Sequence, residues 1–208
     1  MFNALFIKHK IIFLLFVLFS VVGGILLLLI HKGNEVFFFS SLHSSLLNQI
    51  FINITQIAET PGVIIFLILV ALLNYRYLPV FLVNLIVLAL VVTFLKHLVF
   101  ANAMRPSILL ADKGALNFVP GVEIMHNFSF PSGHTAAAFA MCFLFALLFQ
   151  NTWLSFAMFT IATLVGISRL YLLQHFYEDV YAGAIVGMLI SFVVYYGNEK
   201  WKNKRITI

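Results

Sequence analysis

The stretch 129-SFPSGHTAAAFAMCFLFALLF-149 joins a polar turn to a long apolar run. The run contains no charged side chain, and its apolar residues are continuous rather than alternating, which predicts a helix rather than a strand. It begins directly after Ser132, Gly133 and His134, two hydrogen-bonding side chains and one residue without a side chain. Membrane spans usually begin with aliphatic residues or an aromatic anchor. The polar start therefore indicates a functional site at this end of the helix.

The composition of the whole chain is that of a membrane protein. Of its 208 residues 63% are hydrophobic and 9% are charged, whereas soluble domains carry about 25% charged residues. Apolar runs recur that are long enough to cross a hydrocarbon core of about 30 Å, and their unbroken pattern favours helices over a barrel. Cys142 lies inside an apolar run and is interpreted as a small buried residue. The net charge of +5 does not indicate nucleic-acid binding, because the basic residues are scattered or lie at membrane borders.

We expect an all-α, polytopic membrane protein that forms a single domain over residues 1–208. A more polar stretch, 36-VFFFSSLHSSLLNQIF-51, predicts an additional helix lying in the membrane interface. No small-residue cleavage site follows the first span, so we interpret it as retained rather than as a signal peptide. The six expected transmembrane helices cover residues 11–30, 61–74, 80–100, 132–149, 153–168 and 178–197.

Six spans would place both termini on the same side of the membrane. That side would carry seven basic residues and the opposite side five, and a basic excess marks the cytoplasmic face. We therefore predict a protein of the cytoplasmic (inner) membrane with cytoplasmic termini. The terminal side would carry Lys8, Lys10, Arg76, Lys200, Lys202, Lys204 and Arg205, and the opposite side Lys32, Lys96, Arg105, Lys113 and Arg169.

Side chains able to bind phosphate gather at the span ends that face away from the termini. Three are cations, and guanidinium groups match phosphate oxygens with two parallel hydrogen bonds. A helix start offers free backbone N–H groups and the positive end of the helix dipole, both of which favour an anion. A glycine there lets the backbone approach closely. We therefore predict a phosphate pocket formed by Lys96, Arg105, Ser132, Gly133 and Arg169.

Two histidines, His134 and His175, give this pocket the means to do chemistry. One imidazole can attack phosphorus as a nucleophile, and the other can protonate the leaving oxygen. Asp179 follows His175 by four residues, so on a helix both lie on one face and the carboxylate can fix the tautomer of the ring. Nothing in this set requires a metal, because no carboxylate cluster accompanies the histidines.

The predicted site residues fall into three groups along the chain: Lys96 with 105-RP-106, then 131-PSGH-134, then 168-SR-169 with the following His175 and Asp179. This pattern resembles the three-part signature of the type 2 phosphatidic acid phosphatases (PAP2), also called lipid phosphate phosphatases. The resemblance implies an integral-membrane, metal-independent lipid phosphatase without a cofactor, whose site faces the periplasm or exterior. It implies that His175 is the nucleophile that forms a phosphohistidine, that Asp179 supports it and that His134 is the general acid. The phosphate would be held by Lys96, Arg105, Ser132, Gly133 and Arg169.

The first motif departs from the family pattern, which commonly has six residues between its lysine and its arginine. Here eight residues separate Lys96 from Arg105, and on an unbroken helix two extra residues rotate Lys96 by about 200°. Either the helix ends before Arg105, which Asn102 and Pro106 permit, or Lys96 is not the equivalent of the family lysine and is instead a topology anchor at a span end.

The predicted substrate is an amphiphilic phosphate ester or anhydride whose lipid tail stays in the bilayer. Candidates are undecaprenyl diphosphate, phosphatidylglycerol phosphate, phosphatidic acid and the phosphates of lipid A, with the first two favoured because bacterial members of the family often act on them. Two alternatives stay open, namely phosphotransfer from the phosphohistidine to a lipid hydroxyl, and a non-catalytic protein that binds or transports lipid phosphates. The intact set of His134, His175 and Asp179 favours an enzyme. The sequence assigns no oligomeric state.

Overall fold

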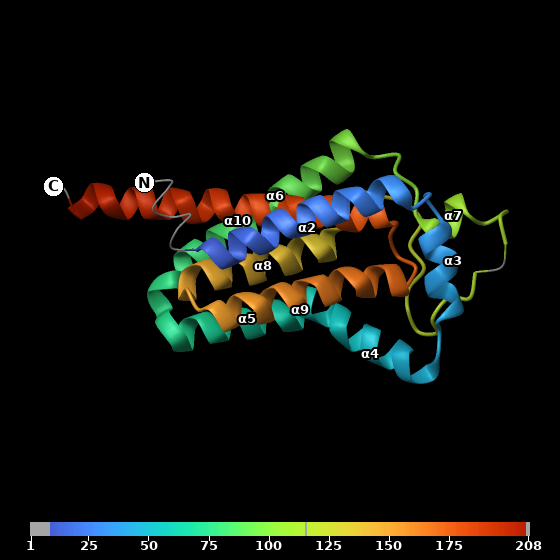
Figure 1. Cartoon of the computed structure of the whole chain (residues 1–208), viewed down its shortest axis with the longest axis horizontal. Helices are drawn as coiled ribbons and strands as arrows, with labels where there is room; N and C mark the ends of the chain where they lie inside the picture. Colours follow the sequence, from blue (N-terminus) through green and yellow to red (C-terminus); the bar gives the residue numbers. More distant parts are fainter. Residues whose placement is uncertain (1–8, 115, 207–208) are drawn as a thin grey trace.

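The computed structural model describes residues 9–114 and 116–206, and the regular secondary structure of these residues is all helical. This confirms the predicted all-α class. Three shorter helices, α3 (Asn34–Ser41), α4 (Ser45–Thr55) and α7 (Pro106–Leu109), lie toward one end of the bundle (Figure 1). The helices that run along its long axis are α2 (Lys10–Leu29), α5 (Thr60–Asn74), α6 (Leu78–Phe94), α8 (Gly133–Phe149), α9 (Thr152–Tyr171) and α10 (Tyr177–Ile206).

Four stretches of the described residues are long and apolar enough to cross a membrane: Lys10–Leu29, Thr60–Val99, Thr152–Tyr171 and Tyr177–Lys204. The second of these contains both α5 and α6, which the 3₁₀ turn η2 (Tyr75–Tyr77) separates. With 17 residues α8 is shorter; its length of about 26 Å falls below a hydrocarbon core of about 30 Å. These stretches support an integral membrane protein, and the count of six spans stays a prediction.

The prediction of one continuous helix near residues 36–51 is wrong, because α3 and α4 share this region. Ser44 has an extended backbone (φ −147°, ψ 156°), and its hydroxyl accepts a hydrogen bond from the N–H of Leu47 (3.4 Å). Ser44 is therefore the N-cap that begins α4 as a separate helix. The ring of His43 forms a hydrogen bond with the backbone carbonyl of Tyr171 (2.8 Å). The side-chain hydroxyl of Tyr171 donates a second hydrogen bond to Asn48 (2.7 Å). These bonds fix α4 against the end of α9.

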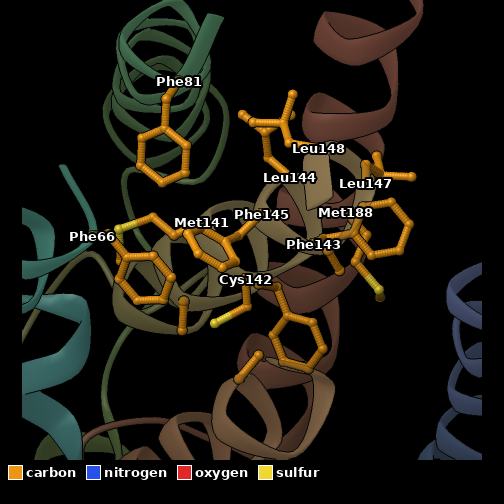
Figure 2. Packing of buried hydrophobic residues seen from close by; sticks show 14 of the residues in the cluster. Phe66, Phe81, Met141, Cys142, Phe143, Leu144, Phe145, Leu147, Leu148 and Met188 are labelled. Carbon is orange, nitrogen blue, oxygen red and sulfur yellow. The ribbon is translucent and has the colours of Figure 1, made fainter. Parts of the chain in front are cut away.

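The core of the bundle is α8, which packs against α10, α9 and α6. Thirteen of its 17 residues are buried, as expected of a helix that is hydrophobic on all sides. Figure 2 shows Phe145 of α8 beside Phe66 of α5; the two rings meet edge to face with centroids 5.7 Å apart. Phe66 in turn stacks on Phe81 of α6. The polar start of α8 is thus fixed in position by an apolar core.

Two glycines let α10 approach the backbone of α8. A Cβ atom on Gly183 would lie 2.5 Å from the carbonyl oxygen of Ser132, and one on Gly187 would lie 2.4 Å from that of Ala136. Small residues at this spacing are typical of closely packed membrane helices. The approach also lets the N–H of Ser132 donate to the carbonyl of Asp179 (2.9 Å). The start of α8 is therefore held directly against the first turn of α10.

The first and last described residues lie at one end of the bundle, and the predicted site lies at the other (Figure 1). A hydrogen bond of 2.9 Å joins the ring of His9, just before α2, to the hydroxyl of Tyr195 in the C-terminal half of α10. At the opposite end, Arg169 lies in the last turn of α9 and Asp179 in the first turn of α10. This arrangement agrees with termini and site on opposite faces of a membrane. The cytoplasmic location of the termini stays a prediction.

Candidate active site

His175 lies in the short connection between α9 and α10, and its side chain is 1% exposed. Nδ1 of the ring lies 3.3 Å from Oδ2 of Asp179, and Nε2 lies 3.4 Å from Nη1 of Arg105. A guanidinium group can only donate hydrogen bonds, so Nε2 must accept and Nδ1 must carry the proton. This tautomer leaves the lone pair on Nε2, the atom that faces the cation.

The carboxylate of Asp179 is held by several donors. Besides facing the ring of His175, Oδ2 accepts hydrogen bonds from the hydroxyl of Ser129 (2.5 Å) and from the N–H of Phe176 (3.0 Å). The side chain is 2% exposed, so these partners replace the water that an ionised carboxylate would otherwise bind. Asp179 is therefore positioned to fix the orientation of His175.

Burial lowers the pKa of His175 well below its ordinary value of about 6.5. Arg105, Arg169 and Lys96 lower the pKa further, and His134 also contributes. A neutral imidazole is the form that can act as a nucleophile. These effects on the pKa of His175 mean that the structure brings the three predicted cations and both histidines within electrostatic range of one another.

The two arginines differ in how they are held. Nε of Arg105 donates to the carbonyl of Asn127 (3.0 Å), and its Nη1 donates to the backbone and side-chain oxygens of Gln174 (3.0 and 3.2 Å). Nη1 of Arg169 donates to the hydroxyl of Thr55 (2.7 Å), whereas its Nε is buried and has no hydrogen-bond partner among the described residues. An unpaired donor on a buried cation fits a phosphate oxygen.

His134, the second histidine, begins α8 and faces a carboxylate. Its Nε2 lies 3.0 Å from Oε1 of Glu59, and the two side chains are 33% and 42% exposed. Both residues line a cavity of about 360 Å³ together with Arg105 and Arg169. One opening therefore gives access to the histidine at the start of α8 and to both guanidinium groups.

Lys96 lies in the π-helical turn η3 (Leu95–Val99), and the helix ends there, before Arg105. Nζ donates to the carbonyl of Phe128 (2.8 Å) and would lie 4.0 Å from a Cβ atom on Gly133. The helix thus ends before Arg105, which releases the constraint of ideal helical spacing on where Lys96 points. Its role in binding phosphate stays a prediction. The missing side chain of Gly133 leaves room for the lysine beside the start of α8.

Ser132 is fully buried and is the N-cap of α8. Its hydroxyl accepts hydrogen bonds from the hydroxyl and from the N–H of Thr135 (2.9 and 3.5 Å). A capping role accounts for these contacts. The expected contact of Ser132 with phosphate stays a prediction.

Four residues that contact the predicted site side chains were not predicted from the sequence: Thr55, Glu59, Ser129 and Gln174. Thr55 and Glu59 flank the 3₁₀ turn η1 (Gln56–Ala58) and contact side chains far along the chain, Arg169 and His134. No pattern in residues 50–60 signals these contacts. Ser129 offered a weak signal, because it lies two residues before Pro131.

The described residues contain no group of three or more His, Cys, Asp or Glu side chains that could hold a metal ion. The carboxylate nearest to His175, that of Asp179, is occupied by hydrogen bonds from Ser129 and Phe176. Metal independence of the reaction stays a prediction.

Comparisons with known proteins agree with this architecture. The family model described as the PAP2 superfamily matches residues 77–203. A lipid A 1-phosphatase of Porphyromonas gingivalis is 44% identical over 70 residues, which are 33% of this chain and 16% of that protein. A lipid A 4'-phosphatase of Bacteroides thetaiotaomicron is 32% identical over 104 residues, which are 50% of this chain and 45% of that protein. The match therefore spans less than half the length of either relative.

Two solved structures share the fold. The crystal structure of Aquifex aeolicus LpxE superposes with a TM-score of 0.66 at 25% identity, covering 76% of this chain and 91% of that one. The PAP2-type phosphatidylglycerolphosphate phosphatase of Bacillus subtilis superposes with a TM-score of 0.64 at 23% identity, covering 91% of this chain and 96% of that one.

Proposed function

This chain belongs to the PAP2 superfamily, and from that premise we propose that it hydrolyses lipid phosphates through a phosphohistidine on His175. The observation that carries the proposal is the position of the buried ring, which has Asp179 at Nδ1 and Arg105 at Nε2. A ring held in this way is neutral and aims its lone pair toward the cations that would hold a phosphoryl group.

The proposed reaction has two steps. In the first, Nε2 of His175 attacks phosphorus, the bond from phosphorus to the leaving oxygen breaks, and protonated His134 gives its proton to that oxygen. In the second, water attacks the phosphohistidine, neutral His134 takes a proton from the water, and the P–N bond breaks to release phosphate. Arg105, Arg169 and Lys96 would stabilise the charge on the phosphoryl oxygens in both steps. Atoms and protons balance without a further reactant.

For the substrate we infer a lipid whose phosphate is attached to a sugar, as in lipid A. The lipid A phosphatases of Porphyromonas gingivalis and Bacteroides thetaiotaomicron support this choice over the diphosphate and glycerophosphate candidates favoured from the sequence. The chemistry of the cavity also supports it, because Gln56, Glu59, Glu123 and Gln174 line it beside the arginines. Carboxylate and amide side chains can accept hydrogen bonds from sugar hydroxyls.

Detergent-purified protein tests the proposal in a phosphate-release assay with EDTA present. The panel contains lipid A, undecaprenyl diphosphate, phosphatidylglycerol phosphate and phosphatidic acid, and His175→Ala is the inactive comparison. Release from lipid A that disappears in His175→Ala is the expected result. Transfer of the phosphoryl group to an added lipid alcohol in preference to water would establish phosphotransfer instead. Binding of these lipids without turnover in the parent protein would contradict an enzymatic role.

A further inference from the structure

His134 contacts a carboxylate that belongs to none of the three sequence motifs. Oε1 of Glu59 lies 3.0 Å from Nε2 of its ring, and both side chains border the cavity that contains the arginines. Resting on the proposed function, we propose that Glu59 is a positioning residue that keeps His134 oriented and stabilises its protonated form for proton transfer to the leaving oxygen.

The charges around His134 make such a partner necessary. Burial disfavours a positive charge on the ring most, and Arg169 of α9 and Lys96 of η3 lie close enough to disfavour it further, so that Glu59 offsets part of these effects. His175, from the connection before α10, is neutral and supplies no compensating charge. Glu59, from the connection before α5, is the anion in contact with the ring. Without it, the protonated form of His134, the form that has a proton to give, would be disfavoured still further.

The fold places Glu59 through the same segment that supports Arg169. Thr55 at the end of α4 accepts a hydrogen bond from Arg169, and the turn η1 then carries the chain to Glu59, whose N–H donates to the carbonyl of Gln56 (3.1 Å). The bonds of His43 and Asn48 to Tyr171 anchor α4 against α9. One segment, residues 43–59, therefore touches a phosphate-binding cation and the general acid together.

The partial exposure of this pair suits a proton donor that must be recharged in each cycle. His134 is 33% and Glu59 42% exposed, whereas His175 and Asp179 are 1% and 2% exposed. After His134 gives its proton to the leaving oxygen, it recovers one from the water that hydrolyses the phosphohistidine. Glu59 changes the relative energy of the two protonation states of the ring, so it acts through His134 rather than on the substrate.

The test compares two leaving groups in Glu59→Gln, which keeps the size and hydrogen bonding of the side chain but removes its charge. A lipid phosphate has a poor leaving group that needs a proton, whereas p-nitrophenyl phosphate expels a stable phenolate that does not. We expect kcat for the lipid to fall about 10- to 100-fold, less than the roughly 10²- to 10⁴-fold that general acid catalysis contributes in full, and kcat for p-nitrophenyl phosphate to change less than about threefold. The alkaline limb of the pH profile should move to lower pH, and Glu59→Asp should restore part of both effects.

The matched control is Glu199→Gln, which removes the same charge at the far end of α10, where Glu199 pairs with Lys202; it should leave both substrates and the profile unchanged. Equal losses of kcat for the two leaving groups, or an unmoved alkaline limb, would overturn the role of Glu59. NMR titration of the His134 ring tests the same point without activity. The midpoint must fall in Glu59→Gln, and an unchanged midpoint refutes the proposal even if the parent hydrolyses lipids. Absence of lipid hydrolysis in the parent would overturn the proposed function alone.

Discussion

Nδ1 of His175 and Oδ2 of Asp179 lie 3.3 Å apart, with His175 in the connection before α10 and Asp179 in its first turn. This contact assigns the proton to Nδ1 and leaves Nε2 as the atom that would attack phosphorus in the proposed reaction. Because the side chain of Asp179 also accepts from Ser129 and Phe176, the orientation of the ring is determined by groups outside the phosphate pocket.

Replacement of Asp179 by Asn should therefore damage turnover more than binding. The amide can donate to Nδ1 and so favour the tautomer with the proton on Nε2, which cannot attack. We expect kcat to fall by about 10²- to 10⁴-fold and KM to change little, because the three cations are retained. Steady-state phosphate release measures both constants. Asp112→Asn, at an exposed position, is the control, and a change confined to KM would contradict the orienting role.

The lowered pKa of His175 predicts how the ring responds to acid. A group whose pKa lies well below about 6.5 stays neutral as the pH falls from 8 to 6 and takes up a proton only under more acidic conditions. The ring resonances of His175, assigned by comparison with His175→Ala, should therefore remain constant over this interval in NMR spectra. A titration midpoint near 6.5 would show that the ring is more accessible to water than the structure indicates.

Thr55→Val should weaken binding of the phosphate group of the substrate. The substitution removes the acceptor for Nη1 of Arg169, whose Nε already has no partner among the described residues, and leaves the guanidinium free to turn. A lost hydrogen bond to a charged group costs about 1.5–3 kcal/mol, so KM should rise about 10-fold or more. Thr55→Ser retains the hydroxyl and should behave like the parent. An unchanged KM in Thr55→Val would mean that Arg169 is held by other contacts.

Gly183→Ala should disturb both stability and activity. Its Cβ atom would lie 2.5 Å from the carbonyl oxygen of Ser132, so α10 must move away from the start of α8. We expect a cost of about 1–3 kcal/mol, visible as a lower Tm in detergent, together with slower phosphate release. Gly197 is the matched control on the same helix, since nothing lies within 4 Å of its Cβ position. Gly197→Ala should be neutral or slightly stabilising, and equal effects at both positions would contradict the close approach.

The sequence alone was sufficient where one local pattern decided the structure. The apolar run after His134 predicted α8 and its start correctly, and the spacing of His175 and Asp179 predicted their contact. Lys96 was harder, because its spacing from Arg105 conflicts with an ideal helix. The π-helical turn and the end of the helix at Val99 resolve the conflict, but neither follows from residue types, since both depend on how α6 ends against its neighbours.

The contacts that escaped prediction join residues distant in the chain. Glu59 meets His134 across 75 positions and Thr55 meets Arg169 across 114, and no periodicity encodes pairings of that range. The helix boundary at Ser44 was missed for another reason. Apolar and polar residues are mixed throughout 36–51, so the amphipathic pattern hid the capping serine that separates α3 from α4.

Residues 43–59 contact pocket side chains from outside the region that the family model matches, and this affects how such proteins can diversify. The family match begins at residue 77, so Thr55 and Glu59 stand outside the portion that defines membership while touching two of its principal side chains. The residues that match the family and Glu59, the proposed partner of His134, therefore lie in separate stretches of the chain. On the proposed role of Glu59, a mutation upstream would change proton delivery without altering a residue of the shared signature.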